Sequence, residues 1–324
     1  MAKILVTGCM GTLGKPLVAE LERRGHEVWG CDLQHQAREN YIRADVANYR
    51  QLERVFEQSF DFVYHLAAEF GRINGEEYYD TLWQTNVIGT RNVLEMQRLK
   101  GFKLIFASSS EIYGENDAET LDEEFPLRQS IVQPNDYAIT KWVNEAQCVN
   151  FEKRYDSPIV RLRFFNAYGP GEHFHRYRSV VCLFCYNALT GRPYEVFEGY
   201  HRVFMYIDDF IPTLATVCEK FTPGEVYNIG GVEYRSVREL SDLILEYTGS
   251  SESLVTYLPE DRHNVVNKRP DISRAQAQFG HNPMVTLEQG VPRTIDWMVS
   301  EYGLSLPRAV RERVRESLTL TESR

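Results

Sequence analysis

Tyr137 and Lys141 are the two residues whose types and spacing most directly suggest chemistry. They lie in NDYAITKWVNEAQ, a segment that predicts a helix beginning after Pro134. Residues at positions i and i+4 share one face of a helix, so the lysine ammonium would lie near the phenol. A nearby cation lowers the pKa of a tyrosine and lets it exchange a proton near neutral pH. The alternative is an ordinary surface pair on an exposed helix.

The glycine-rich turn TGCMGTLG, residues 7–14, follows a predicted strand and opens a predicted helix. Gly8 can make the tight turn, Gly11 can let the backbone approach a pyrophosphate, and Gly14 can let helix and strand pack closely. The amino terminus of the helix adds N–H groups and partial positive charge. The spacing predicts a dinucleotide site, with a purely structural turn as the alternative.

Asp32 ends the next predicted strand, about 18 residues after Gly14. A carboxylate there can accept a hydrogen bond from the adenine-ribose 2′-OH and repel a 2′-phosphate. Because no lysine or arginine is among the next three residues, this strand end favours NAD over NADP. Asp45 and Val46 follow in a loop that could meet the adenine. The alternatives are an ordinary strand cap for Asp32 and a plain turn for Asp45.

The segment ASSSEIYG, residues 107–114, places Glu111 after three serines and the apolar run KLIF. In an extended segment, residues i and i+2 point to the same face, so Ser109 and Glu111 are expected to face one site. A carboxylate in that position can act as a general base. The alternative is a cap or turn residue.

The elements that must position these residues alternate along the first half of the chain. Strands are predicted at KILVTG, HEVWGCD, DFVYHLAA and KLIFASSS, and helices at 12–24, 49–58 and 76–100. Alternating strands and helices, with nearly unbroken apolar strands, predict parallel βαβ units in a doubly wound α/β sheet covered on both faces.

The second half of the chain is more mixed. Strands are predicted at PIVRLRFF, EVYNIGG and LVTYLP, and helices at 178–190, 208–220, 236–247, 287–302 and from about 306 onward. We expect a Rossmann domain at 1–170 and a smaller mixed α/β region at 171–324 that binds substrate. Residues at about 203–231 are expected to return to the Rossmann domain.

Composition narrows the class of protein. The chain has 324 residues, 43% of them hydrophobic, and a net charge of −10 that argues against a nucleic-acid binder. No apolar run approaches the roughly 20 residues that cross a bilayer. The six scattered cysteines favour reduced thiols in a cytoplasmic protein. Cys182 and Cys185 have CxxC spacing but no second ligand pair, so no metal site is predicted.

Together these motifs resemble the extended short-chain dehydrogenase/reductase family of nucleotide-sugar epimerases and dehydratases. The resemblance covers residues 3–303. It is carried by the glycine turn, the Asp32 strand end, and HLAA (65–68), TNVIGT (85–90), SSSEIYG (108–114), YAITK (137–141), RFFNAYGPGE (163–172), RVFMYIDD (202–209) and YNIGG (227–231). Cys9 and Met10 depart from the small residues usual in the turn, which puts the detailed fit of the cofactor in question.

The resemblance implies a tightly bound NAD that is reduced and reoxidised within one cycle. Tyr137 would take the proton from the sugar C4 hydroxyl, Lys141 would tune Tyr137 and hold the cofactor ribose, and Ser109 would hydrogen-bond the same oxygen. Tyr137 and Lys141 are also expected to contact the cofactor. Its other expected contacts are Gly8, Gly11, Thr12, Leu13, Gly14, Asp32, Asp45, Val46, Leu66, Ala67, Ala68, Ala107 and Asn86, the last with a structural alternative.

The resemblance also implies a nucleotide-diphosphate sugar as substrate and a homodimer formed by the helices near 76–100 and 134–155. The expected substrate contacts are Ser109, Ser110, Asn166, Arg176, Arg202 and Arg269. Paired arginine donors suit a diphosphate, although a surface salt bridge is the alternative for each arginine. The loop 171–181 adds His173, His175 and Arg178, which could bind an anion, supply a second acid or base, or be solvated.

Glu111 bears on which reaction follows oxidation at C4. A 4-epimerase needs no further base. A 4,6-dehydratase needs a base at C5 and an acid for the leaving 6-hydroxyl, a uronic-acid decarboxylase uses the keto group to accept electrons, and a 3,5-epimerase needs a base and a proton donor on opposite faces. Because Ser-x-Glu resembles the dehydratases and decarboxylases, we place 4,6-dehydratase chemistry first and 4-epimerase chemistry second. A non-catalytic NAD-binding sensor and a ketoreductase that releases its cofactor are alternatives from other classes.

Overall fold

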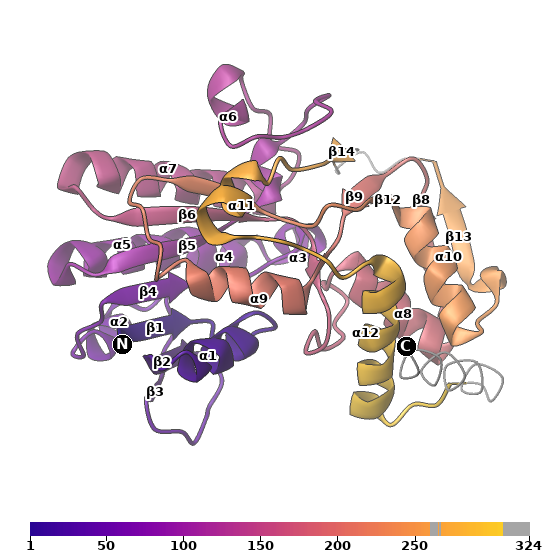
Figure 1. Cartoon of the computed structure of the whole chain (residues 1–324), viewed down its shortest axis with the longest axis horizontal. Helices are drawn as coiled ribbons and strands as arrows, with labels where there is room; N and C mark the ends of the chain where they lie inside the picture. Colours follow the sequence, from indigo (N-terminus) through magenta and orange to yellow (C-terminus); the bar gives the residue numbers. More distant parts are fainter. Residues whose placement is uncertain (260–264, 266, 307–324) are drawn as a thin grey trace.

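The computed structural model describes residues 1–259, 265 and 267–306, which form two lobes (Figure 1). The larger lobe is built on a seven-stranded parallel sheet with the strand order β11-β6-β5-β4-β1-β2-β3. This confirms the expected doubly wound α/β fold. The strands are β1 (Lys3–Thr7), β2 (Glu27–Asp32), β3 (Tyr41–Arg43), β4 (Phe62–His65), β5 (Lys103–Ser109), β6 (Ile159–Phe164) and β11 (Val226–Ile229).

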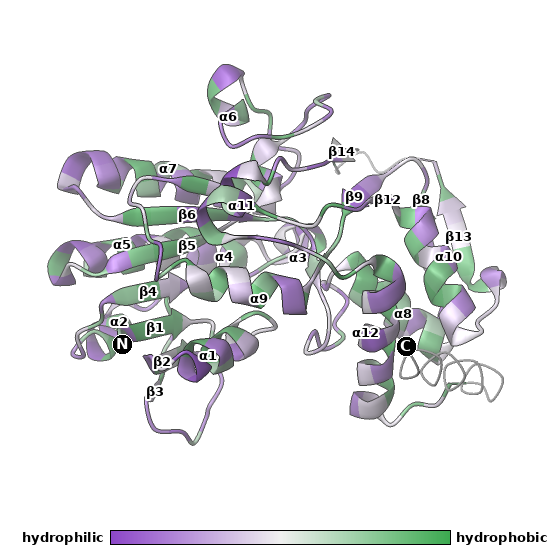
Figure 2. Cartoon of the chain, viewed as in Figure 1, coloured by the Kyte–Doolittle hydropathy of each residue, from purple (hydrophilic) through white to green (hydrophobic). Residues whose placement is uncertain are grey.

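Helices cover both faces of this sheet because successive strand residues point to opposite sides. Ile4 and Val6 of β1 belong to one apolar cluster, whereas Leu5 between them belongs to the other. The first cluster includes α1 (Gly14–Arg23) and α9 (Ile207–Thr216), and the second includes α2 (Tyr49–Val55), α5 (Gly89–Lys100) and α7 (Asp136–Tyr155). Figure 2 shows the hydrophobic strands between these helices.

The smaller lobe packs α8 (Val180–Thr190), α10 (Val237–Thr248) and α12 (Leu287–Tyr302) around short strands. These strands form pairs or a three-stranded sheet: β7 (Ala167–Tyr168) with β10 (Met205–Tyr206), β8 (Tyr194–Phe197) with β13 (Val255–Leu258), and β9 (His201–Val203) between β12 (Tyr234–Ser236) and β14 (Asn267–Lys268). One apolar cluster runs through both lobes. The α9 helix and β11 lie in the larger lobe, with α11 (Ser273–Phe279) beside β11.

The prediction of one long helix at 76–100 is wrong. The structure has α3 (Arg72–Glu77) and α4 (Tyr79–Trp83) before a π-helical turn (Gln84–Ile88) that runs into α5. Tyr78, with φ −128° and ψ 52°, interrupts the helix. The π-turn carries Asn86, which bonds the loop after β4. The helix predicted from about 306 lies outside the described residues.

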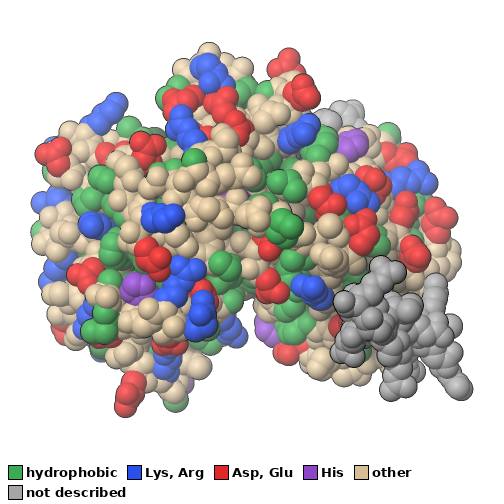
Figure 3. Space-filling view, viewed as in Figure 1, with side chains coloured by type: hydrophobic (Ala, Val, Ile, Leu, Met, Phe, Trp, Pro, Cys, Tyr) green, Lys and Arg blue, Asp and Glu red, His purple; other side chains and the backbone are tan. Residues whose placement is uncertain are grey.

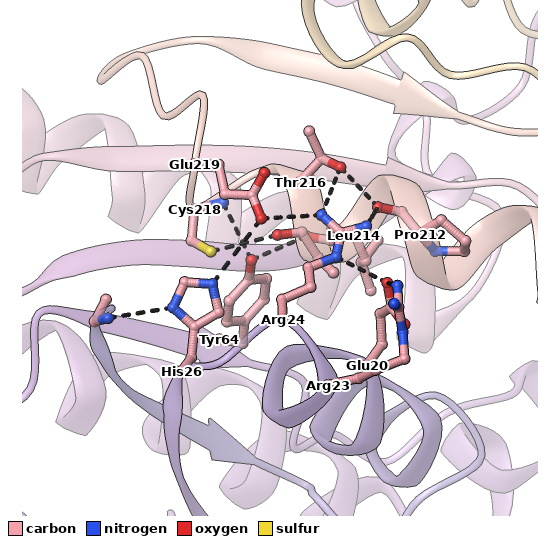
Figure 4. A network of polar contacts seen from close by, with 12 residues as sticks. Glu20, Arg23, Arg24, His26, Tyr64, Pro212, Leu214, Thr216, Cys218 and Glu219 are labelled. Carbon is pink, nitrogen blue, oxygen red and sulfur yellow. Dashed lines mark hydrogen bonds and ion pairs between the residues drawn. The ribbon is translucent and has the colours of Figure 1, made fainter.

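Arg24 joins the two helices that cover the first face of the sheet (Figure 4). Arg24 follows the last turn of α1. Its guanidinium donates to the Thr216 hydroxyl at 3.0 Å and to the Pro212 carbonyl at 3.0 Å, both on α9. The Tyr64 hydroxyl of β4 donates to the Leu214 carbonyl at 2.9 Å. These bonds fix α1, and therefore the glycine turn before it, relative to the sheet.

Acidic and basic side chains are interspersed on the face of the molecule drawn in Figure 3. Within the described part of the chain, no helix has both the length and the apolarity to span a bilayer. All six cysteines are buried and carry free thiols. Cys182 and Cys185, both on α8, pack in the apolar cluster that runs through both lobes.

Candidate active site

A cavity of about 630 Å³ lies at the carboxyl ends of strands β1 to β6, where ligands bind in doubly wound sheets. The larger lobe contributes the glycine turn, the strand ends and the start of α7. The segment after β6 adds Asn166, and the loop that leads to α8 adds Tyr177 and Arg178. The cavity is therefore bounded by both lobes.

The glycine turn fits a group that the backbone must approach closely. Gly8 has a φ of +72°, and a Cβ there would lie 2.7 Å from the Ala67 amide nitrogen. A Cβ at Gly14 would collide with the Gly8 carbonyl. The turn thus leaves room for a pyrophosphate beside the amino terminus of α1, where backbone N–H groups favour an anion.

Cys9 does not occupy the space of the cofactor. Its side chain is only 5% exposed and points into the core. Gly30 on β2 makes the room, because a Cβ at that position would lie 2.6 Å from the Cys9 sulfur. Met10 bonds Asp32 through its backbone N–H, at 3.0 Å from the Oδ2 atom. The two unusual residues of the turn are therefore compatible with the cofactor.

Asp32 lies at the cavity with Asp45 and Val46. Of the residues predicted to contact the cofactor, Asn86 is the one that the structure does not place there. It is buried, accepts a hydrogen bond from the Glu69 N–H at 2.9 Å, and donates one to the Glu69 carbonyl at 2.9 Å. Asn86 therefore holds the loop after β4, which is the structural alternative.

Tyr137 and Lys141 face the cavity from the first two turns of α7. The Lys141 ammonium donates to the Ala107 carbonyl at 2.9 Å and lies 5.9 Å from the centre of the Tyr137 ring. Burial of this cation lowers the pKa of Lys141 from 10.5 to about 8. The ammonium joins the start of α7 to the end of β5.

The predicted fall in the pKa of Tyr137 is wrong. Burial raises the pKa of Tyr137 above its usual value, and the charge of Glu111 adds to the rise. A hydrogen bond with Ser109 acts in the opposite direction. Desolvation dominates because phenolate is poorly stabilised away from water. The phenol is therefore protonated at neutral pH.

Glu111 reaches the cavity by a different geometry from the one expected. The strand ends at Ser109, and Ser110–Tyr113 form a 3-10 helix rather than an extended segment. The Ser109 hydroxyl caps this turn by accepting a hydrogen bond from the Glu111 N–H at 3.2 Å. Ser109, Ser110 and Glu111 nevertheless all line the cavity.

Lys268 is a functional candidate that the sequence did not reveal. This buried lysine, on β14, forms an ion pair with the Glu111 carboxylate. Burial alone would raise the pKa of Glu111. The ion pair with Lys268 and the charge of Arg202 outweigh burial and hold this pKa below its usual value. Glu111 is therefore ionised. The only signal in the sequence was the position of Lys268 next to Arg269.

The predicted substrate contacts are only partly brought together. Asn166 lines the cavity and donates to the Val203 carbonyl at 3.0 Å. Arg202 is buried on β9, close enough for its charge to affect Glu111. Arg269 is exposed and lies 3.9 Å from Glu119, outside the cavity lining.

Arg176 is also turned away from the cavity, contrary to the prediction. It forms an exposed ion pair with Glu77 of α3, because the loop before α8 crosses towards that helix. The next residues, Tyr177 and Arg178, line the cavity instead, with the Arg178 guanidinium 4.7 Å from the centre of the Phe70 ring.

The two histidines of this loop are exposed beside other groups. His173 lies 3.6 Å from Glu301, and the His175 ring packs on Tyr177. Neither histidine lines the cavity.

The model of the NAD dependent epimerase/dehydratase family matches residues 4–230. The chain belongs to this family. Membership confirms the resemblance and the expected cofactor, NAD. Family membership does not decide which reaction the chain catalyses, because its relatives are named for different activities.

One relative is the UDP-N-acetyl-alpha-D-glucosaminuronate decarboxylase of Bacillus cytotoxicus, which is 29% identical over 91% of this chain and 97% of that protein. A probable dTDP-glucose 4,6-dehydratase of Sinorhizobium fredii is 26% identical over 91% of this chain and 92% of that protein. The solved UDP-glucose 4-epimerase of Thermotoga maritima, with UDP-glucose, superposes with a TM-score of 0.83 at 28% identity, over 93% of this chain and 99% of that one.

Proposed function

We propose that this protein oxidises a nucleotide-activated sugar at C4 and then catalyses 4,6-dehydration through the transient 4-keto intermediate. The observation that carries the proposal is the ionised Glu111 carboxylate, which lines the same cavity as Ser109 and Tyr137. A 4-epimerase has no need for this carboxylate. A dehydratase needs it to remove the proton from C5, which the neighbouring keto group makes acidic.

The residues at the cavity divide the first step between them. The glycine turn and Asp32 would hold the pyrophosphate and the adenine ribose. Bound NAD supplies a reversible hydride acceptor and, when oxidised, a positive charge that favours phenolate at Tyr137. The Ser109 hydroxyl would orient the C4 oxygen, and Tyr137 would take its proton. Lys141 would hold the ribose and stabilise the phenolate.

Decarboxylation of a uronic-acid sugar is the second candidate. It is supported by the similarity to the B. cytotoxicus decarboxylase, which covers nearly the full length of both chains. In that reaction C5 loses its carboxylate as carbon dioxide, and the electron pair passes into the 4-keto group. The step requires a proton donor at C5 but no base.

A panel of UDP-, GDP-, dTDP- and CDP-linked hexoses and hexuronic acids, followed by mass spectrometry, tests the proposal. We expect loss of water from a hexose substrate. Loss of carbon dioxide from a hexuronate would establish the second candidate. An unchanged mass with altered NMR couplings would identify an epimerase and contradict both.

Glu111→Gln is expected to slow product formation by roughly 10²- to 10⁴-fold, the usual contribution of a general base. Reduction of NAD by the substrate should continue, because the first step does not use Glu111. Glu115→Gln, at an exposed position four residues on, is the matched control. Full product formation by Glu111→Gln would show that this carboxylate is not the base.

A further inference from the structure

Lys268 is a buried cation that is bound directly to the proposed base. Lys268 is only 3% exposed, and its ammonium pairs with Glu111, which lies 157 residues earlier in the chain. The strand that carries it, β14, runs parallel to β9, with Lys268 opposite Arg202. Two segments of the smaller lobe thus bring a lysine to the carboxylate of the larger lobe.

The backbone beside Lys268 is held in place by the segment that follows the 3-10 helix. The Leu121 N–H donates to the Arg269 carbonyl at 2.8 Å, and the Asp271 N–H donates to the Leu121 carbonyl at 2.9 Å. Asn228 of β11 also donates to the Leu121 carbonyl, at 2.9 Å. Hydrogen bonds on this side and strand pairing with β9 on the other side fix the position from which the lysine reaches Glu111.

We propose that Lys268 is the proton donor of the step that follows oxidation at C4, with Glu111 as the proton acceptor. The inference rests on the proposed function and adds the acid that this function requires. An ammonium can release a proton, whereas the guanidinium of Arg202, whose charge also reaches Glu111, stays protonated. Lys141 is committed to the Ala107 carbonyl beside Tyr137. Lys268, by contrast, forms an ion pair with Glu111 itself.

The dehydration balances with this pair. Glu111 takes the proton from C5, and the electron pair of the C5–H bond passes into the enolate of the 4-keto sugar. The C6–O bond then breaks as a C5–C6 double bond forms, and the oxygen leaves as water with the proton of Lys268. The hydride that NAD accepts from C4 in the first step would then be delivered to C6, while Glu111 would return its proton to C5 and Lys268 would regain one from solvent.

The same donor serves the second candidate reaction. There the C5–C6 electron pair enters the enolate as carbon dioxide leaves, and Lys268 protonates C5. The role of Lys268 is therefore defined by where the proton goes, to the leaving oxygen in one case and to C5 in the other.

Two substitutions in the full-length enzyme with bound NAD test this role. Lys268→Gln removes the proton donor but also the charge that keeps Glu111 ionised. Lys268→Arg keeps the charge and the ion pair but cannot release a proton. For both variants we expect NAD to be reduced by substrate at a rate near that of the wild type, with product formation slowed roughly 10²- to 10⁴-fold. Lys220→Gln, at an exposed position, is the matched control.

Each other outcome overturns a specific statement. Product formation at the wild-type rate by Lys268→Arg would show that the residue acts by its charge alone. Loss of both NAD reduction and thermal stability in both variants would assign Lys268 a structural role. A wild-type enzyme that loses neither water nor carbon dioxide from any sugar would overturn the proposed function and this inference together. Normal turnover by Lys268→Gln would overturn the inference alone.

Discussion

Burial sets the protonation of the two residues at the start of α7. Lys141 is 5% exposed and has a pKa of about 8, so its ammonium group loses its proton under mildly alkaline conditions. Tyr137 is shifted the other way, towards the neutral phenol. Both shifts have the same cause, because each favours the uncharged form in a poorly hydrated site. Burial therefore disfavours both the phenolate of Tyr137 and the ammonium of Lys141.

The shift at Lys141 predicts how stability depends on pH in the protein stripped of NAD. Because its pKa is lower in the folded protein, the unfolded chain binds more protons between about pH 8 and 10.5. The free energy of unfolding should therefore increase as pH rises through this window. That increase is roughly 3–4 kcal/mol at most, since one pKa unit corresponds to about 1.4 kcal/mol. Below about pH 8 the full cost of the buried charge remains.

Urea unfolding of the wild type and Lys141→Met across this pH range measures the effect. The alkaline gain should disappear in Lys141→Met. Lys153→Met, at an exposed position on the same helix, should retain it. The same pH dependence in the wild type and in Lys141→Met would mean that Lys141 has an ordinary pKa.

At the scale of elements, a buried ion pair joins the pieces that carry the site. Arg163 of β6 donates to the two carboxylate oxygens of Glu145 on α7, at 2.9 and 2.8 Å. The Ser108 hydroxyl at the end of β5 donates to the same carboxylate, and Arg163 donates to the Tyr113 hydroxyl at 3.0 Å. This network connects the strand of Ser109, the turn of Glu111 and the helix of Tyr137.

Arg163→Met should destabilise the protein by about 3–5 kcal/mol, because it leaves the Glu145 carboxylate buried without its partner. The comparison is Arg238→Met, which breaks an ion pair with Glu198 whose side chains are 48% and 47% exposed. That change should cost about 1 kcal/mol or less. Urea unfolding at neutral pH measures both. Equal costs for the two variants would contradict a stabilising role for the buried network.

The sequence was sufficient for elements with a local pattern. The apolar run of β1, the glycine turn and the i, i+4 pair on α7 are local, and the structure places each as expected. The break at Tyr78 accompanies a π-turn whose Asn86 bonds a distant loop, so tertiary contacts override the helical pattern there. Lys268 has no local signal beyond its position next to Arg269, since it meets Glu111 only when the two lobes pack together.

The whole molecule makes the site from both of its lobes. Ser109, Glu111, Tyr137 and the glycine turn line the cavity from the larger lobe, and Arg178 lines it from the loop before α8. Lys268 of β14 reaches Glu111 from the smaller lobe. The loop before α8 also reaches back to α3 through the pair of Arg176 with Glu77. Contacts between the lobes therefore bring together Glu111 and Lys268, the proposed proton acceptor and donor.

We propose that two copies of the chain associate through α5 and α7, which lie side by side on the face of the sheet opposite α1 and α9 (Figure 1). Both helices expose large apolar side chains, with Leu99 of α5 55% exposed and Trp142 of α7 47% exposed. A second copy would cover these residues and form a four-helix interface. Trp142 lies next to Lys141, so the interface would support the helix that carries Tyr137 and Lys141.

Trp142→Glu should convert the proposed dimer to a monomer. An exposed tryptophan at an interface is a common energetic hot spot, and a glutamate buried there would lack a partner. A cost of about 2–4 kcal/mol corresponds to a roughly 30- to 1000-fold weaker dimer. Sedimentation velocity over a range of protein concentrations measures the change. Leu127→Glu, at a position on α6 that is 80% exposed, should leave the assembly unaltered. A wild-type protein that sediments as a monomer at every concentration would contradict the proposed interface. In that case, contacts within one chain alone would hold α7, and with it Tyr137 and Lys141, in place.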